Sequence, residues 1–146
     1  MVGSPWQTMA NLLEDLAFIR ELQPQMIGIG PFIPHHATPF KNYPAGTLEQ
    51  TLTLLSVLRL MFPKVLLPAT TALGTIVPNG RELGILAGAN VVMPNLSPAD
   101  VRQNYLLYDN KLCSGAEAAE AKNDLAARLH SIGYEIAEGR GDYKES

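Results

Sequence analysis

The sequence is poor in cysteine and in charge of either sign. Its one cysteine, Cys113, has no partner for an internal disulfide and cannot hold a metal cluster by itself. Charged residues make up 17% of the chain, and a formal net charge of −3 gives no basic surface for nucleic acid or an anionic membrane. No apolar run is long enough to span a bilayer, and no basic leader precedes an apolar stretch near Met1. These absences predict a cytoplasmic protein with neither a nucleic-acid nor a membrane partner.

Helical patterns alternate with short apolar stretches along the 146 residues. Apolar side chains recur at three- and four-residue spacing in the helical stretches, whereas the intervening stretches are uniformly apolar, as in strands covered on both faces. This order predicts an α/β fold with parallel strands joined by helices. Three strands are few for a free-standing domain, so we expect a fragment of a larger one. The expected helices span residues 8–22, 47–62, 81–87, a stretch from 97, and 115–132, and the expected strands span 26–30, 65–67 and 91–93.

The loop after the first expected strand has unusual composition. In parallel α/β folds, ligands bind on the loops that follow the strands. Residues 28–40 hold three prolines, two aromatic residues and two isoleucines, which suit a flat ring bound against an apolar wall; a purely structural loop is the alternative. We expect the side chains of His35 and His36, adjacent on an extended loop, to point apart. Because no third ligand stands at a recognisable spacing, the prediction is that no metal binds here.

Two further groups of polar residues are candidates for a binding site. Residues 68–75 place three threonine hydroxyls at a strand end, which suits a carboxylate or a phosphate, although threonines also satisfy local backbone groups. Tyr105 and Tyr108 lie three residues apart on one helix face, where core aromatic residues are the alternative. No P-loop and no pattern of nucleophile and base occurs, so no catalytic residue is assigned.

Four motif blocks carry a resemblance to a known family. They are Met1-Val2-Gly3, Gly28-Ile29-Gly30-Pro31-Phe32-Ile33-Pro34-His35, Pro68-Ala69-Thr70-Thr71-Ala72 and Gly88-Ala89-Asn90-Val91-Val92-Met93-Pro94-Asn95. In order and spacing they resemble the radical S-adenosylmethionine (SAM) maturases of iron-iron hydrogenases, the HydE family, from Met1 to about Gly141. Biotin synthase is a more distant relative with the same barrel.

The resemblance implies a fold and a chemistry. The family fold is a (βα)8 TIM barrel that binds SAM and a 4Fe-4S cluster, and the cluster cleaves SAM to a 5′-deoxyadenosyl radical. The maturase acts on a small iron-containing precursor, together with other hydrogenase maturases, during assembly of the two-iron subcluster. By this resemblance, residues 1–141 form the C-terminal portion of the barrel, with about strands six to eight and their helices, and residues 142–146 form a polar tail.

The resemblance also implies roles for individual residues. One group is expected to contact the SAM adenine, and a second to line the substrate cavity. The first group is Met1, Val2, Gly3, Gly30, Pro31, Phe32 and Ile33, and the second is Met26, Thr70, Thr71, Met93, Tyr105 and Tyr108.

Departures from the family pattern qualify the expected activity. The three-cysteine motif that binds the cluster is absent, so we expect the chain to be inactive alone. Trp6 stands where the family has glycine. Cys113 matches one ligand of an accessory cluster, but Ala121 and Asp124 replace the others, so that cluster is expected to be absent.

Two other interpretations stay open. One is a fragment of another biotin synthase-like radical SAM enzyme. The other is a truncated, non-catalytic binding or self-associating module. Because we expect an unpaired strand edge at residues 26–30, the expected partner is the missing N-terminal half-barrel or a second copy of the chain.

Overall fold

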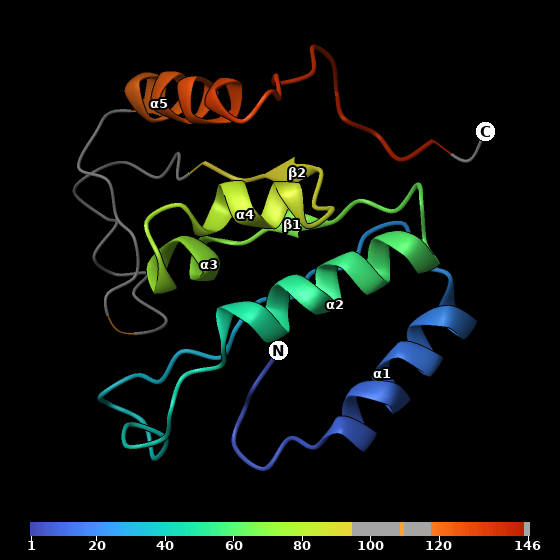
Figure 1. The fold of residues 1–146 in the computed structure, drawn as a ribbon, viewed down its shortest axis with the longest axis vertical. Helices are drawn as coiled ribbons and strands as arrows, with labels where there is room; N and C mark the ends of the chain where they lie inside the picture. The colour runs from blue at the N-terminus through green and yellow to red at the C-terminus, as the bar shows by residue number, and fades with distance from the viewer. Residues whose placement is uncertain (95–108, 110–117, 145–146) are drawn as a thin grey trace.

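The computed structural model describes residues 1–94, 109 and 118–144, with five helices and two short strands among them (Figure 1). None of these helices is long and apolar enough to cross a bilayer. The helix expected from Ser97 lies outside the described residues. The elements are α1 (Met9–Leu22), α2 (Leu48–Met61), β1 (Pro68–Ala69), α3 (Thr71–Ile76), α4 (Gly80–Leu86), β2 (Val91–Val92) and α5 (Ala118–Ser131).

The first two helices begin at side-chain caps. The Thr8 side chain accepts a hydrogen bond from the Asn11 backbone N–H at 3.3 Å, and the Asn11 side chain accepts one from the Thr8 N–H at 3.0 Å. At α2, the Thr47 hydroxyl accepts a bond from the Gln50 N–H at 3.2 Å. Each cap satisfies N–H groups that the first helical turn leaves unpaired. The predicted helices over 8–22 and 47–62 are therefore confirmed to within a residue at each end.

Four extended segments run parallel to one another in the order of the sequence. Val2 is bridged to Pro31, and Met26 is bridged to Leu66. β1 then pairs with β2, with Pro68 opposite Val91 and Ala69 opposite Val92. Because successive parallel segments are joined through helices, the predicted α/β alternation is confirmed. The strands themselves are shorter than predicted, since regular pairing covers only two residues in β1 and β2.

The predicted unpaired edge at residues 26–30 is wrong. The Ile27 N–H donates to the Leu66 carbonyl at 2.9 Å, and the Val2 N–H donates to the Gly30 carbonyl at 2.9 Å. The segment therefore has a neighbour on each side. It lies between the N-terminal residues and the segment that leads into β1.

The third and fourth segments are also joined by a side chain. The Leu67 N–H donates to Asn90 Oδ1 at 2.8 Å, and the Asn90 N–H donates back to the Leu67 carbonyl at 2.9 Å. Leu67 is fully buried, so its backbone groups need partners within the protein. Asn90 thus extends the pairing of β1 and β2 by one step towards their N-terminal ends.

One hydrophobic core connects the segments to the helices. α4 packs on β1 and against both α2 and α3, and α5 lies on the opposite side of the molecule from α1 (Figure 1). α5 contributes two buried leucines and an ion pair between Arg128 and the buried Glu82 of α4. The core consists of Ile27, Leu55, Leu58, Phe62, Val65, Leu67, Ala69, Leu73, Ile85, Ala89, Leu125 and Leu129.

α3 is a helix that was not predicted, because residues 68–75 were expected only to follow a strand. Its six residues include a glycine and β-branched side chains, which are weak helix formers. Tertiary packing overrides that weakness. Leu73 is fully buried, and a β-carbon on Gly80 would lie 2.0 Å from the Leu73 carbonyl oxygen, so α4 starts in direct contact with α3.

Candidate functional site

A pocket of about 680 Å³ lies where the second and third parallel segments end. Loops from both segments border it, as expected for ligand sites in parallel α/β folds. Eight residues predicted to bind the cofactor or the substrate line this one pocket. They are Met1, Gly30, Pro31, Phe32, Ile33, Thr70, Thr71 and Met93.

The other predicted residues lie elsewhere. Val2 is buried, and its backbone pairs with Gly30 and Phe32. Gly3 has a positive φ of 74° and lies against Gly46. Met26 lines a different pocket of about 720 Å³, beside residues 134–137 of the C-terminal segment. Tyr105 and Tyr108 lie outside the described residues.

Gly30 and Thr70 are in close contact at the base of the pocket. A β-carbon on Gly30 would lie 2.7 Å from Thr70 Oγ1, so only glycine fits there without movement of Thr70. Thr70 is the N-cap residue of α3, but its side chain makes no capping hydrogen bond. Its hydroxyl oxygen is buried and has no hydrogen-bond partner among the residues that the structure describes. Thr70 therefore holds a buried polar atom, unpartnered among the described residues, against Gly30, and both residues line the pocket.

An apolar wall faces this hydroxyl group. Phe32, Ile33 and Phe40 all line the pocket, which matches the apolar wall predicted for residues 28–40. Phe40 also makes edge-to-face contacts with Phe32, Trp6 and Tyr43, with ring centroids 6.2, 6.0 and 5.9 Å away. These contacts fix the position of a loop that is otherwise exposed.

Trp6 holds a strained backbone conformation beside the pocket. Its φ is 65°, in the left-handed region that favours glycine, and its residue surface is 74% exposed. The ring still contacts Tyr43, with centroids 5.3 Å apart. The glycine expected at this position by family resemblance would adopt the same φ without strain.

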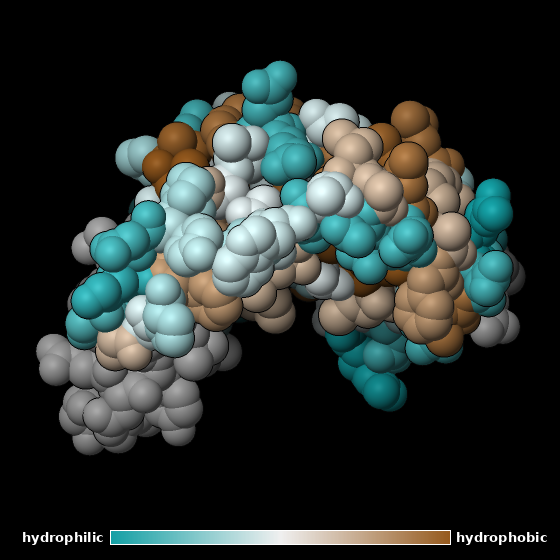
Figure 2. Space-filling model, turned by 90° about the horizontal axis from the view of Figure 1, so that it is seen from below, coloured by the Kyte–Doolittle hydropathy of each residue, from teal (hydrophilic) through white to brown (hydrophobic). Residues whose placement is uncertain are grey.

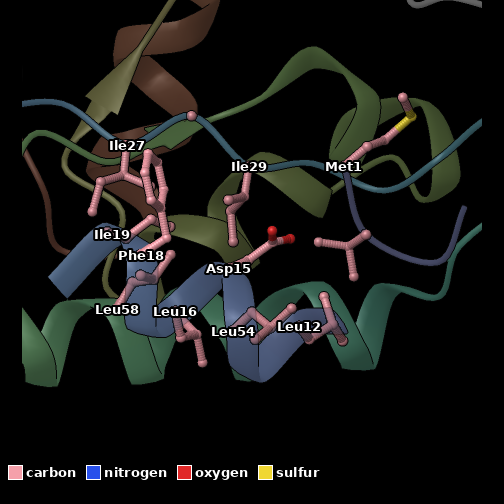
Figure 3. Close-up of a pocket in the computed structure, with 12 residues that line it drawn as sticks. Met1, Leu12, Asp15, Leu16, Phe18, Ile19, Ile27, Ile29, Leu54 and Leu58 are labelled. Carbon is pink, nitrogen blue, oxygen red and sulfur yellow. The ribbon is translucent and has the colours of Figure 1, made fainter. Parts of the chain in front are cut away.

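A smaller pocket of about 250 Å³ separates α1 from residues 27–29 (Figure 3). Leucine and isoleucine side chains from α1 and α2 line it, together with Phe18. The Asp15 carboxylate extends into the same space towards Ile29 (Figure 3). Of the predicted site residues, only Met1 and Val2 reach this pocket, which adjoins the main pocket because Met1, Gly28 and Ile29 line both.

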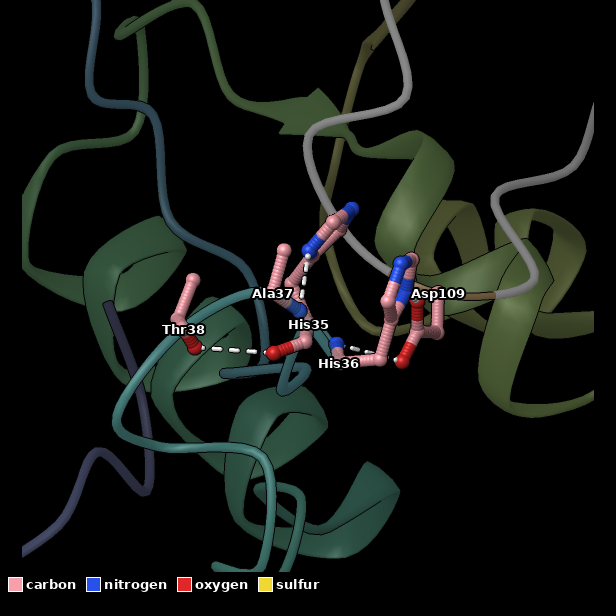
Figure 4. Close-up of polar contacts among 5 residues, drawn as sticks. All are labelled: His35, His36, Ala37, Thr38 and Asp109. Atoms are coloured by element: carbon pink, nitrogen blue, oxygen red, sulfur yellow. Dashed lines mark hydrogen bonds and ion pairs between the residues drawn. The ribbon is translucent and has the colours of Figure 1, made fainter.

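His35, His36 and Asp109 form a polar cluster at the edge of the main pocket (Figure 4). The expectation that the two histidines point apart is wrong, because their rings stack with centroids 4.4 Å apart. A turn causes this: the Thr38 N–H donates to the His35 carbonyl at 3.0 Å. Asp109 lies 73 residues further along the chain than His36, which explains why spacing could not reveal it.

Known proteins resemble the chain over most of its length. No protein-family model matches it. The [FeFe] hydrogenase maturase subunit HydE of Thermotoga maritima is 50% identical over 113 residues, which are 77% of this chain and 32% of that protein. The predicted resemblance to HydE is confirmed. By its name, that relative takes part in [FeFe] hydrogenase maturation.

Two relatives with another name also match. The 3-methylornithine synthase of Methanosarcina barkeri is 37% identical over 89 residues, and that of Methanosarcina acetivorans is 28% identical over 127 residues. The matched parts are 61% and 87% of this chain. The chain spans 25% to 35% of the lengths of these curated relatives and of HydE.

Of the two cofactors that the resemblance to HydE implies, SAM suits the pocket. Its volume lies within the range of small-molecule sites, and it combines an apolar wall with a buried, unpartnered hydroxyl group. A 4Fe-4S cluster does not fit, because it needs three cysteine thiolates and the chain has one cysteine. No step through an iron-sulfur cluster follows from these residues.

Proposed function

We propose that this chain forms the C-terminal portion of a radical SAM (βα)8 barrel in a hydrogenase maturase, with about strands six to eight. In this role it supplies walls for the SAM adenine and for a small iron-containing precursor. The supporting observation is the single pocket that gathers predicted adenine-contacting residues and predicted substrate residues at the ends of parallel segments. The 50% identity to HydE, against 37% and 28% for the two synthases, favours the maturase over another radical SAM enzyme.

The loop that begins at Gly30 suits an adenine ring. Phe32 and Ile33 offer apolar surface, and proline at position 31 limits the freedom of the backbone. Gly28 has nothing within 4 Å of where a β-carbon would lie, so a flat ligand can approach the backbone there. Stacking on such a wall favours a ring without requiring a charged partner.

The opposite side of the pocket suits an anionic or carboxylate group of the substrate. The hydroxyl group of Thr70 can donate a hydrogen bond, and it has no competing partner in the described part of the chain. Thr71 and Met93 border the same space. An unpaired buried hydroxyl group costs free energy that a bound acceptor would recover.

Radical formation requires groups that lie outside these residues. SAM and a 4Fe-4S cluster are the cofactors of the family, and SAM cleavage depends on three cysteine thiolates. We propose that the remainder of the barrel, in the same protein or in a second chain, supplies them. The isolated 146 residues are then expected to yield no 5′-deoxyadenosine above background after anaerobic cluster reconstitution.

Calorimetric titration of the chain with 5′-deoxyadenosine tests the adenine wall. Saturable binding is expected, and Ile33→Ala should weaken it about tenfold because apolar contact with the ring is lost. Ile136→Ala is the matched control, since Ile136 is partly exposed and lines the separate pocket beside the C-terminal segment. Absence of binding by the wild-type chain, or equal weakening by both variants, would contradict the proposal.

A further inference from the structure

Three potential metal ligands converge at the edge of the main pocket. One ligand atom from each of His35, His36 and Asp109 lies within 4.8 Å of the other two (Figure 4). Ligands around a tetrahedral ion with bonds near 2.0 Å are about 3.3 Å apart. His36 Nδ1 and Asp109 Oδ1 are 2.6 Å apart, below that value, and no separation among the three atoms exceeds 4.8 Å. Because the two imidazole rings stack, the side chains must rotate for all three atoms to surround one ion.

The backbone holds these side chains in place from both sides. The Asp109 carboxylate accepts a hydrogen bond from the His36 backbone N–H at 2.8 Å. The Asp109 N–H donates in turn to the Pro34 carbonyl at 3.3 Å. On the other side, the Ala37 N–H donates to His35 Nδ1 at 3.1 Å, a bond that an ion would replace on binding this nitrogen. The cluster is therefore organised without an ion.

The side chains are accessible enough to exchange partners. The His36 side chain is 76% exposed and that of Asp109 is 38% exposed. Exposed ion pairs contribute little to stability, so the contact between His36 and Asp109 is easily replaced by bonds to an ion.

We propose that His35, His36 and Asp109 bind one divalent transition-metal ion. Two imidazole nitrogens and one carboxylate oxygen are the donor set that suits Zn²⁺ and Fe²⁺, whereas Mg²⁺ and Ca²⁺ prefer oxygen alone. Three protein ligands leave at least one coordination position for water or a small molecule. His35 also lines the main pocket, so the ion lies at the border of that pocket. The site does not depend on the proposed SAM-binding role.

Zn²⁺ titration in competition with a chromophoric chelator tests the site. The chain should carry Cys113→Ser, which removes its one thiol as a competing ligand. One equivalent of Zn²⁺ is expected to bind. His35→Ala, His36→Ala and Asp109→Asn should each weaken binding by at least about tenfold, because loss of even an outer-shell partner can cost that much. Co²⁺ should give a visible absorption band that each variant diminishes.

His130→Ala is the matched control. His130 is the third histidine of the chain and is exposed near the end of α5, away from the cluster, so its removal should leave affinity unchanged. Far-ultraviolet circular dichroism should show that all variants stay folded. Absence of Zn²⁺ binding, or equal weakening by His130→Ala, would overturn the site. Unchanged affinity in Asp109→Asn would also overturn it, because the carboxylate would then be only a partner of His36.

Discussion

The backbone of Gly30 lies so close to Thr70 that a β-carbon on residue 30 would be 2.7 Å from the threonine hydroxyl oxygen. Gly30→Ala should therefore lower the free energy of unfolding by about 1–3 kcal/mol, the usual cost of overpacking. Gly28→Ala is the control, since a β-carbon there has no neighbour within 4 Å. Urea unfolding of both variants measures the difference. Equal stability of the two would show that Thr70 moves aside without cost.

Removal of the Thr70 hydroxyl group should not destabilise the protein. The oxygen is buried without a partner in the described part of the chain, and it does not cap α3. Because Thr70→Val keeps the shape and removes only this unsatisfied group, the free energy of unfolding should stay the same or rise by about 1 kcal/mol. Thr53→Val, at an exposed position of α2, controls for the change in β-branched residue. A clear loss of stability specific to Thr70→Val would mean that the hydroxyl group is paired.

The backbone conformation at position 6 should be less favourable for tryptophan than for glycine. At a φ of 65° an L-residue is strained by about 1–2 kcal/mol, whereas glycine is not. Trp6→Gly and Trp6→Ala both remove the ring, so their difference isolates the backbone. We expect the glycine variant to be the more stable by about 1 kcal/mol in thermal or urea unfolding. An alanine variant that is as stable as the glycine variant would contradict the strained conformation.

The ion pair between Glu82 and Arg128 should make α5 docking sensitive to acid. Burial acts to raise the pKa of the Glu82 carboxyl, but the hydrogen bond and charge of Arg128 lower it below the ordinary value of 4.5 overall. The pair therefore stabilises the fold above about pH 4.5, and this contribution is lost as the pH falls through the lowered pKa of the folded protein.

Arg128→Met tests that dependence. At neutral pH the substitution should lower the free energy of unfolding by about 2 kcal/mol. This is less than for a fully buried pair, because the Arg128 side chain is 34% exposed. The gap between the variant and the wild type should narrow as the pH is lowered below 4.5, because Glu82 then becomes neutral. Chemical unfolding over a pH series measures this difference in free energy of unfolding. A difference that does not change with pH would show that the ion pair is not its cause.

Much of the fold could be predicted because local signals agree with it. Thr8 and Thr47 are good caps before amphipathic stretches, and both helices form at those positions. α3 could not be predicted, because its six residues have weak helical propensity and are held by burial of Leu73. The paired neighbours of residues 26–30 were missed for a similar reason. Pairing through single bridges leaves no periodic signal in the sequence.

In the site, too, features set by local sequence could be predicted, and features set by contacts between distant residues could not. The rule that ligands bind after parallel strands led to the loops at Gly30 and Thr70, and the structure places both loops around one pocket. The cluster of His35, His36 and Asp109 could not be predicted, because it depends on a turn at residues 35–38 and on a residue far along the chain. Met26 was assigned to the cavity but lies in a different pocket, because it is at the start of the segment whose end, at Gly30 and Pro31, lines the main pocket.

The location of an adenine ligand is the most direct test of the central claim. Two-dimensional ¹H–¹⁵N NMR spectra of the chain should be recorded during titration with 5′-deoxyadenosine. The proposed role predicts chemical-shift changes concentrated at the backbone amides of Gly30, Phe32 and Ile33, with weaker changes at Thr70 and Thr71. Changes concentrated instead around α1 and Leu54, which line the smaller pocket, or no changes at all, would contradict the adenine wall.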